Sequence, residues 1–288
     1  EFWNRMELKV KPYNIFFFFI FLGLSCTDNP FWNDPPTKVM KLTGIVDTEN
    51  NITNTPAYVW FEGLDIDTVT NENKEFIIEI NRTQSPAGNI NGPLKIYFYL
   101  HNYRISHATI YFTNGYFSDS QTDFSADGEL LEPVLLEKLV SAETYLPPIF
   151  NSSFEETLKV KLDLDVHSLT AWLIGYKRVL SQNTYLPSGV IFRSLVDPQV
   201  IHINRLHNDS IVPLEYDPGS AITWVYEIDS DSLLLLPGMY EVFPFFLVSQ
   251  DHIPDDLLYS LGIDNISAIN SAYLQLPMDM IPGTLIVQ

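Results

Sequence analysis

The segment Val160–Val166, VKLDLDV, alternates apolar and polar residues over its whole length. Successive side chains of a β-strand point to opposite faces of the sheet, so this period of two predicts a strand with one buried and one solvated face. A sheet that is buried on one face only is typical of antiparallel β proteins. The segment therefore predicts an all-β fold.

Short apolar or alternating runs continue on both sides of this segment, and Asn, Asp, Gly and Pro residues separate them. A spacing of roughly 8–20 residues between such runs favours antiparallel β-sandwiches over βαβ units. Hydrophobic residues make up 46% of the chain, which is enough to build a sizeable core. The expected strands are Lys38–Val46, Ala57–Glu62, Lys74–Ile80, Leu94–Leu100, His107–Thr113, Thr157–Val166, Thr170–Tyr176, Gly189–Val196, Gln199–Asn204, Ala221–Ile228, Met239–Val248 and Thr284–Val287.

Helical signals are few. The segment Ile253–Leu261 has Pro254 near its start, two acidic residues after it and Gly262 just beyond, a pattern that predicts a short helix. The segment Glu129–Val140 is compatible with a helix or with a closing strand, and Pro133 disfavours a regular helix there.

The N-terminal segment has the pattern of a secretory signal. Met6 is followed by Lys9 and Lys11 and then by an apolar run from Ile15 to Leu24. This run is about half of the roughly 20 residues that a membrane-spanning helix needs. Basic residues, a short apolar run and a polar mature start predict a signal peptide over residues 1–25, with residues 1–5 preceding a plausible start Met.

The apolar run ends in Leu22-Gly23-Leu24-Ser25-Cys26, which resembles the lipobox of bacterial lipoproteins. The resemblance implies that Cys26 becomes lipidated after cleavage and holds the protein on a membrane. Cys26 is also the single cysteine of the chain, so it has no disulfide partner within it. The alternative is an ordinary signal peptide with an incidental cysteine. Thr27, in place of the Asp associated with inner-membrane retention, favours the outer membrane over the inner one.

The sequence predicts five sections. Residues 1–25 are the signal peptide, and residues 26–37 form a tether rich in Pro, Asn and Asp. Residues 38–143 form a first β-sandwich, residues 144–155 form a linker with a Pro pair, and residues 156–288 form a second β-sandwich of unknown family.

Residues 41–113 resemble the carboxypeptidase regulatory-like domain, a transthyretin-like or Ig-like β-sandwich. The similarity lies in an ordered series, in which Lys74 replaces a frequent turn glycine: Leu42-Thr43-Gly44-Ile45-Val46, Ala57-Tyr58-Val59-Trp60-Phe61, Thr68-Val69-Thr70, Glu75-Phe76-Ile77-Ile78, Gly92-Pro93-Leu94-Lys95-Ile96 and Tyr103. The resemblance implies an accessory module without catalysis. Alternation in these strands places Val59 and Phe61 against Phe76 and Ile78.

The charge balance limits the partners. A formal net charge of −20 repels nucleic acid and anionic lipid headgroups. Nucleic acid is therefore not an expected partner. The lipobox resemblance implies the membrane as a partner, through lipid on Cys26, and envelope proteins or glycans are the other expected partners. No cofactor is expected, because the sequence contains no phosphate-binding glycine loop.

Candidate sites are sparse. Asp65 and Asp67 share a strand face, which makes them the best candidate cation ligands, with solvated strand ends as the alternative. No metal is predicted, because the six histidines include no HExxH pair. The tyrosines Tyr97, Tyr99, Tyr103 and Tyr111 are candidates for an aromatic platform that binds sugars or peptides, or else for core positions.

No catalytic residue is predicted, because the sequence contains no GxSxG elbow. The sequence thus favours a membrane-anchored envelope lipoprotein that acts in binding, adhesion or assembly. An exported glycan or peptide hydrolase with a spatially assembled acidic site is one alternative, since such carboxylates are paired only in space. A purely structural envelope component is the other alternative.

Overall fold

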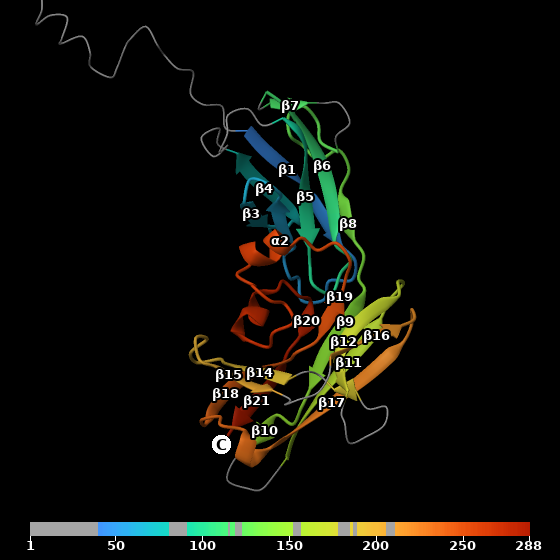
Figure 1. Ribbon diagram of the computed structural model, residues 1–288. Helices are drawn as coiled ribbons and strands as arrows, with labels where there is room; N and C mark the ends of the chain where they lie inside the picture. Colours follow the sequence, from blue (N-terminus) through green and yellow to red (C-terminus); the bar gives the residue numbers. More distant parts are fainter. Residues whose placement is uncertain are drawn as a thin grey trace, which may run out of the picture. The chain divides into compact units, whose positions relative to one another are not determined.

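The computed structural model describes residues 40–80, 91–114, 116–118, 123–151, 157–177, 185–186, 189–205 and 211–288. The predicted signal peptide, Cys26 and the tether lie outside these residues. The regular secondary structure of the described chain is almost entirely β-strand, which confirms the predicted all-β fold class (Figure 1). None of its helices is long and apolar enough to cross a bilayer.

The first part of the chain is a sandwich of two sheets. A three-stranded sheet has the order β4-β1-β8, and a five-stranded sheet has the order β3-β2-β5-β6-β7. The strands are β1 (Met40–Thr48), β2 (Tyr58–Phe61), β3 (Ile66–Val69), β4 (Glu75–Ile80), β5 (Gly92–Tyr99), β6 (Ser106–Thr113), β7 (Tyr116–Ser118) and β8 (Val134–Leu136).

Alternation decides which side chains fill this sandwich. Leu42 from one sheet and Val59 and Phe61 from the other share one buried cluster with Phe76 and Ile78, as the sequence predicts. Strand β2 is buried on both faces, because its other side chains point away from this cluster into a second one. A strand that is covered on both sides carries no polar residue, and YVWF fits that rule.

The turn between β3 and β4 explains the unusual Lys74. This residue has a φ of 65°, in the left-handed region that favours glycine. The side chain of Asn71 stabilises the turn, because its Oδ1 accepts hydrogen bonds from the backbone N–H groups of Asn73 and Glu75. These bonds hold the backbone in a conformation that a lysine rarely adopts.

The remaining strands build three further sheets. Their orders are β10-β21-β18-β14-β15, β17-β11-β9-β20 and β13-β12-β16, and β19 pairs with β12. The strands are β9 (Val140–Tyr145), β10 (Ile149–Phe150), β11 (Thr157–Val166), β12 (Ala171–Lys177), β13 (Tyr185–Leu186), β14 (Gly189–Ser194), β15 (Ile201–Arg205), β16 (Ile211–Tyr216), β17 (Ala221–Asp229), β18 (Gly238–Pro244), β19 (Leu247–Ser249), β20 (Met280–Ile281) and β21 (Gly283–Val287).

The apolar residues of β11 pack in two directions. Leu158 and Val160 contact the sheet that contains β14, β18 and β21, whereas Leu162 and Leu164 belong to a cluster with β12 and β19. The outer residues of β11, Lys161, Asp163 and Asp165, are partly or fully exposed. The alternation of this strand therefore has the predicted structural meaning.

Residues 250–279 cover the face of strands β2 and β5 that points away from the core of the first sandwich. The sequence did not predict this cover. The helix α2 (Asp255–Ser260) and the 3-10 helix η3 (Ser271–Gln275) contribute Leu257 and Tyr273 to a cluster with Tyr58, Trp60 and Tyr99. This cluster joins strands β2 and β5 to the C-terminal part of the chain. A second 3-10 helix, η2 (Ser230–Ser232), follows β17.

Some predicted elements differ in detail. The helix expected at Ile253–Leu261 is α2, and the segment Glu129–Val140 contains strand β8 rather than a helix. The strand expected over Met239–Val248 is divided into β18 and β19, which belong to different sheets. Pro244 ends β18, because proline has no backbone N–H to continue a ladder. Three short strand pairs are parallel, β1–β8, β10–β21 and β20–β9, in an otherwise antiparallel fold.

The predicted linker 144–155 begins inside β9, and this strand pairs with β11 on the far side of it. The chain from Met40 to Gln288 clusters as one compact unit. The division into independently folding domains at residues 144–155 stays a prediction.

A candidate ligand groove beside Tyr97

A buried carboxylate organises the region where the first sandwich meets the C-terminal segment. Asp279 Oδ2 accepts hydrogen bonds from Lys138 Nζ at 2.6 Å and from the Tyr103 hydroxyl at 3.0 Å. Asp279 Oδ1 accepts from the Thr53 hydroxyl at 2.6 Å and from the Thr53 N–H at 2.9 Å. The side chains of Lys138 and Asp279 are each 1% exposed. We call these four residues the Asp279 cluster.

The chemistry of this cluster is that of an ion pair. Burial raises the pKa of the Asp279 carboxyl, but hydrogen bonds from Lys138 and Thr53 outweigh that effect and hold the pKa below its ordinary value. A buried charge is tolerated when it is paired and hydrogen-bonded, and both conditions are met here. The cluster fixes residues 102–104, because Asn102 also bonds both the N–H and the C=O of Asp279.

Gln250 holds the same segment from the other side. Its Oε1 accepts from the Ile105 N–H at 2.8 Å, and its Nε2 donates to the carbonyls of His101 at 3.1 Å and Tyr103 at 2.7 Å. The segment 101–105 is therefore held rigidly between β5 and β6, although it has no regular structure of its own.

This segment forms one wall of an open groove with a volume of about 1080 Å³, which we call the Tyr97 groove. Tyr97 and the apolar side chains of Ile105, Leu139 and Leu169 lie on its surface. The polar lining of the groove comes from β5, β6, β19 and the loops that follow β2, β5 and β19 or precede β12. These residues are Glu62, Lys95, Arg104, His107, Thr170, Ser249, Gln250, Asp251 and His252.

A row of rings crosses the sheet beneath the groove. Trp60, Tyr97 and His107 lie on the neighbouring strands β2, β5 and β6, with ring centroids 5.8 Å and 5.7 Å apart. Lys95 Nζ lies 5.9 Å from the centre of the Tyr97 ring. The row ends in an exposed imidazole, and burial together with the charge of Lys95 lowers the pKa of His107. Trp60 Nε1 is buried without a hydrogen-bond partner among the described residues.

The four candidate tyrosines do not form one platform. Tyr99 and Tyr103 are fully buried, Tyr99 beside His101 and Tyr103 in the Asp279 cluster, so neither is available to a ligand. Tyr111 is half-buried on β6 and does not line the groove. Tyr97 lines the groove, but at 9% exposed it is also a buried residue of the cluster that contains Trp60 and Tyr99, so only a small part of it faces a ligand. Alternation along β5 predicts that Tyr97 and Tyr99 share a face. It does not predict which of these side chains are covered by residues 250–279.

The cation candidates Asp65 and Asp67 lie at the start of β3 with exposed side chains. Among the residues that the structure describes, no group of three or more His, Cys, Asp or Glu side chains is placed to hold a metal ion. The oxygen ligands of a calcium site would have to come from further residues. Asn71, Glu72 and Asn73, whose side chains carry oxygen atoms, lie in the β3–β4 turn.

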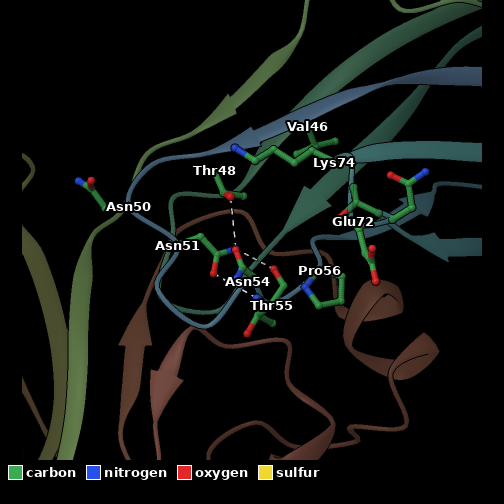
Figure 2. Close-up of a pocket in the computed structure, with 11 residues that line it drawn as sticks. Val46, Thr48, Asn50, Asn51, Asn54, Thr55, Pro56, Glu72 and Lys74 are labelled. Carbon is green, nitrogen blue, oxygen red and sulfur yellow. Dashed lines mark hydrogen bonds between the residues drawn. The ribbon is translucent and has the colours of Figure 1, made fainter.

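A second hollow, of about 890 Å³, lies beside the loop that joins β1 to β2. Figure 2 shows that Asn51 and Thr55 point toward each other across this loop, with Thr48 beside them. Asn51 Nδ2 donates to the Thr55 carbonyl at 2.8 Å, and Asn51 Oδ1 accepts from the Thr55 N–H. Lys74 forms an ion pair with Asp47 there. Several of these groups bond to one another, and no aromatic residue is among the described residues that line the hollow, so we take the Tyr97 groove as the better candidate ligand site.

Two arrangements resemble catalytic ones and lack essential parts. Ser141 Oγ lies 2.7 Å from His167 Nε2, but no carboxylate in the described part of the chain bonds to His167. Asp163 lies beside Glu143 and Asp165 in a small hollow. Burial raises the pKa of Asp163, but the hydrogen bonds from Lys161 and Thr223 together outweigh burial. The pKa of Asp163 is therefore below its ordinary value. A glycosidase acid needs a raised pKa, so Asp163 does not suit that role.

Comparisons with known proteins identify no family for this chain. No protein-family model matches the sequence, and no curated protein matches it. The crystal structure of a point mutant of the major pilin from Streptococcus pyogenes is a weak match, with a TM-score of 0.21 and 11% identity, covering 71% of this chain and 81% of that chain. Such a low score carries no argument about function. The similarity of residues 41–113 to the carboxypeptidase regulatory-like domain remains a prediction.

Proposed function

We propose that this chain is an exported, lipid-anchored protein of the bacterial cell envelope that binds a saccharide in the Tyr97 groove and catalyses no reaction. The observation that carries the binding proposal is the composition of this groove. An aromatic side chain and apolar residues lie beside carboxylate, amide, hydroxyl and imidazole groups on a rigid sheet. Ligand sites commonly combine an apolar surface with a few placed polar groups in this way.

A saccharide fits these groups better than an apolar ligand does. The ring faces of sugars are apolar enough to pack on the half-buried Ile105 and Leu169 and on the small exposed part of Tyr97. Their hydroxyls need donors and acceptors in the plane of the ring. Glu62 and Asp251 supply acceptors, and Arg104 and His107 supply donors. The walls are held by Gln250 and the Asp279 cluster, which reduces the ordering cost of binding.

The anchoring proposal is supported by the sequence alone. The short apolar run before Cys26 and the absence of a second cysteine in the chain fit a lipidated residue. An exported location would place the groove outside the cytoplasm, where envelope glycans are found.

Metabolic labelling with a fatty-acid analogue tests the anchor in a bacterial host. The full chain should incorporate the label, and Cys26→Ala should abolish it. Ser25→Ala is the matched control, because it keeps a small residue before the cysteine and should preserve labelling. Label that persists in Cys26→Ala would remove the anchoring proposal.

Isothermal titration of the protein from residue 38 onward tests binding. The probes are oligosaccharides of four to six sugar units, neutral and acidic. We expect at least one to bind, and we expect His107→Ala to weaken its binding about tenfold, because the exposed imidazole lines the groove. Lys41 lies on β1 in the other sheet, so the Lys41→Gln protein should bind the same probe with unchanged affinity. A protein that binds none of these probes would favour the purely structural alternative.

The hydrolase alternative predicts product formation. Incubation of the same oligosaccharides with the protein, followed by chromatography, should leave them intact if the groove only binds. Cleavage that is lost in Asp163→Asn would instead support an acidic site in the hollow beside Glu143.

A further inference from the structure

Lys95 differs from the other lysines whose side chains the structure describes. Five of these six lysines have an acidic side chain within 4.0 Å, at Glu79, Asp47, Asp279, Glu227 and Asp163. Lys95 is the sixth, and no carboxylate of the described residues lies within that distance of its Nζ. In a protein with a formal net charge of −20, an unpaired lysine is conspicuous.

The position of Lys95 is set by the sheet. It lies on β5, half-buried, on the same face as Tyr97, and its strand neighbour on β6 is Thr109. Its charge reaches the groove, because it lowers the pKa of His107 together with burial, against the opposing effects of Asp123 and Glu62. Arg104 adds a second cation to the same groove, and its own partner Glu137 is 3.7 Å away in an exposed pair.

We infer that the saccharide bound in the Tyr97 groove is anionic and that its charged group pairs with Lys95. This inference rests on the proposed function. A cation that has no carboxylate of the described residues within 4.0 Å, at the edge of a groove, is a ready site for one negative charge on a ligand. Glu62 and Asp251 line the groove too, and they suit hydroxyls rather than further anions. The fitting ligand thus carries isolated negative charges among neutral hydroxyls.

The charge of the whole protein narrows the class further. A field from a net charge of −20 repels a dense polyanion at long range, whereas a sugar chain with few charges meets less repulsion. Either a carboxylate, as in a uronic acid, or a sulfate ester supplies the required anion. Salt should weaken the interaction, because Lys95 is only partly buried.

Titration calorimetry at low salt tests the inference with three probes of equal length: a uronic-acid oligosaccharide, its carboxyl-reduced neutral form and a sulfated neutral oligosaccharide. At least one anionic probe should bind about tenfold more tightly than the neutral form. Lys95→Gln should remove this preference, because it should weaken the binding of the anionic probe much more than that of the neutral form. Lys95→Arg should retain the preference, and Lys41→Gln is the control for a general change in charge.

The outcomes separate the two proposals. Equal affinity for the neutral and both anionic probes would overturn this inference and leave saccharide binding in place. A preference that survives in Lys95→Gln would overturn the assignment to Lys95. If no probe binds to the unchanged protein, the proposed function itself fails and this inference fails with it.

Discussion

Asp279 shows how one side chain connects distant parts of this sequence. Its carboxylate accepts bonds from Thr53, Tyr103 and Lys138, which are separated from it by 226, 176 and 141 residues. Buried ion pairs cost desolvation energy, and they are stabilising only when their hydrogen bonds are complete. Lys138 meets this condition with a further bond of 2.8 Å to the Asn50 carbonyl.

Removing the cation alone should therefore be costly. We expect Lys138→Met to lower the free energy of unfolding by about 3–5 kcal/mol, because it leaves the Asp279 charge buried without its partner. Lys41→Met breaks an exposed pair with Glu79 and should cost less than about 1 kcal/mol. Urea denaturation of both variants measures the difference. Equal effects of the two substitutions would show that the Asp279 cluster is not a strong stabilising element.

His101 should make the protein sensitive to acid. Burial lowers the pKa of His101 to about 4, against the opposing effect of a backbone hydrogen bond with Phe246. The unfolded chain takes up a proton near pH 6.5, whereas the folded protein resists it until about pH 4. The protein therefore loses no stability through His101 above pH 6.5. As the pH falls from 6.5 toward 4, this residue lowers the free energy of unfolding by up to about 3 kcal/mol.

Denaturation curves between pH 7 and pH 4 test this dependence. His101→Gln should show a shallower loss of stability with falling pH, because it has no titrating imidazole. His252→Asn is the matched control, since His252 is exposed and asparagine tolerates its φ of 71°. An unchanged slope in His101→Gln would assign the acid sensitivity to other groups.

At the scale of the elements, Gly44 explains why β1 needs a glycine in its centre. The segment 128–130 lies beside β1 in a parallel bridge, with hydrogen bonds from the Thr43 N–H to the Gly128 carbonyl and from the Leu130 N–H to the Thr43 carbonyl. A Cβ atom on Gly44 would lie 2.6 Å from Leu130 Cβ and 2.8 Å from Phe76 Cε1. Neither neighbour can move away easily, since Phe76 belongs to the core.

Gly44→Ala should therefore lower the free energy of unfolding by about 1–3 kcal/mol, the usual cost of overpacking. Gly238→Ala is the control, because the nearest atom to its added Cβ would be 3.6 Å away, an ordinary contact. Thermal unfolding followed by circular dichroism compares the two variants. A Gly44→Ala protein as stable as the control would mean that the segment 128–130 shifts without cost.

Most elements with a clear period could be predicted from the sequence, although the six-residue strands β9 and β16 could not. Most very short elements could not be predicted either. The alternation in Val160–Val166 predicted the central part of β11, and the positions of Pro254 and Gly262 predicted α2. Strands of two or three residues, such as β10, β13 and β20, are too short to show a period, so they were missed. Their pairing depends on tertiary contacts that no local pattern contains.

The Tyr97 groove was only partly predictable for a similar reason. Tyr97 was a candidate from the density of aromatic residues, but Lys95 and His107 carry no local signal that separates them from other surface residues. Their relation to Arg104 and Gln250 arises because the loop after β19 returns to β5 and β6. A buried Lys138 was equally hidden, because lysine is almost always exposed.

At the scale of the molecule, the clusters of buried residues decide whether the predicted halves can fold separately. A fragment of residues 38–143 would lack Asp279 and leave Lys138 without its partner. It would also lack residues 250–279, which cover Tyr58, Trp60 and Tyr99, and it would keep most of β9 without its partner β11. Exposed apolar surface of this size favours aggregation.

We therefore expect the fragment 38–143 to be unfolded or aggregated, whereas the chain 38–288 should be a soluble, cooperatively folded protein. Expression of both, with size-exclusion chromatography and near-ultraviolet circular dichroism, makes the comparison. A monomeric 38–143 fragment with a cooperative unfolding transition would instead establish the boundary at residues 144–155. In that event the Asp279 cluster would serve to orient two stable domains, and Lys138→Met should change their association more than the stability of either one.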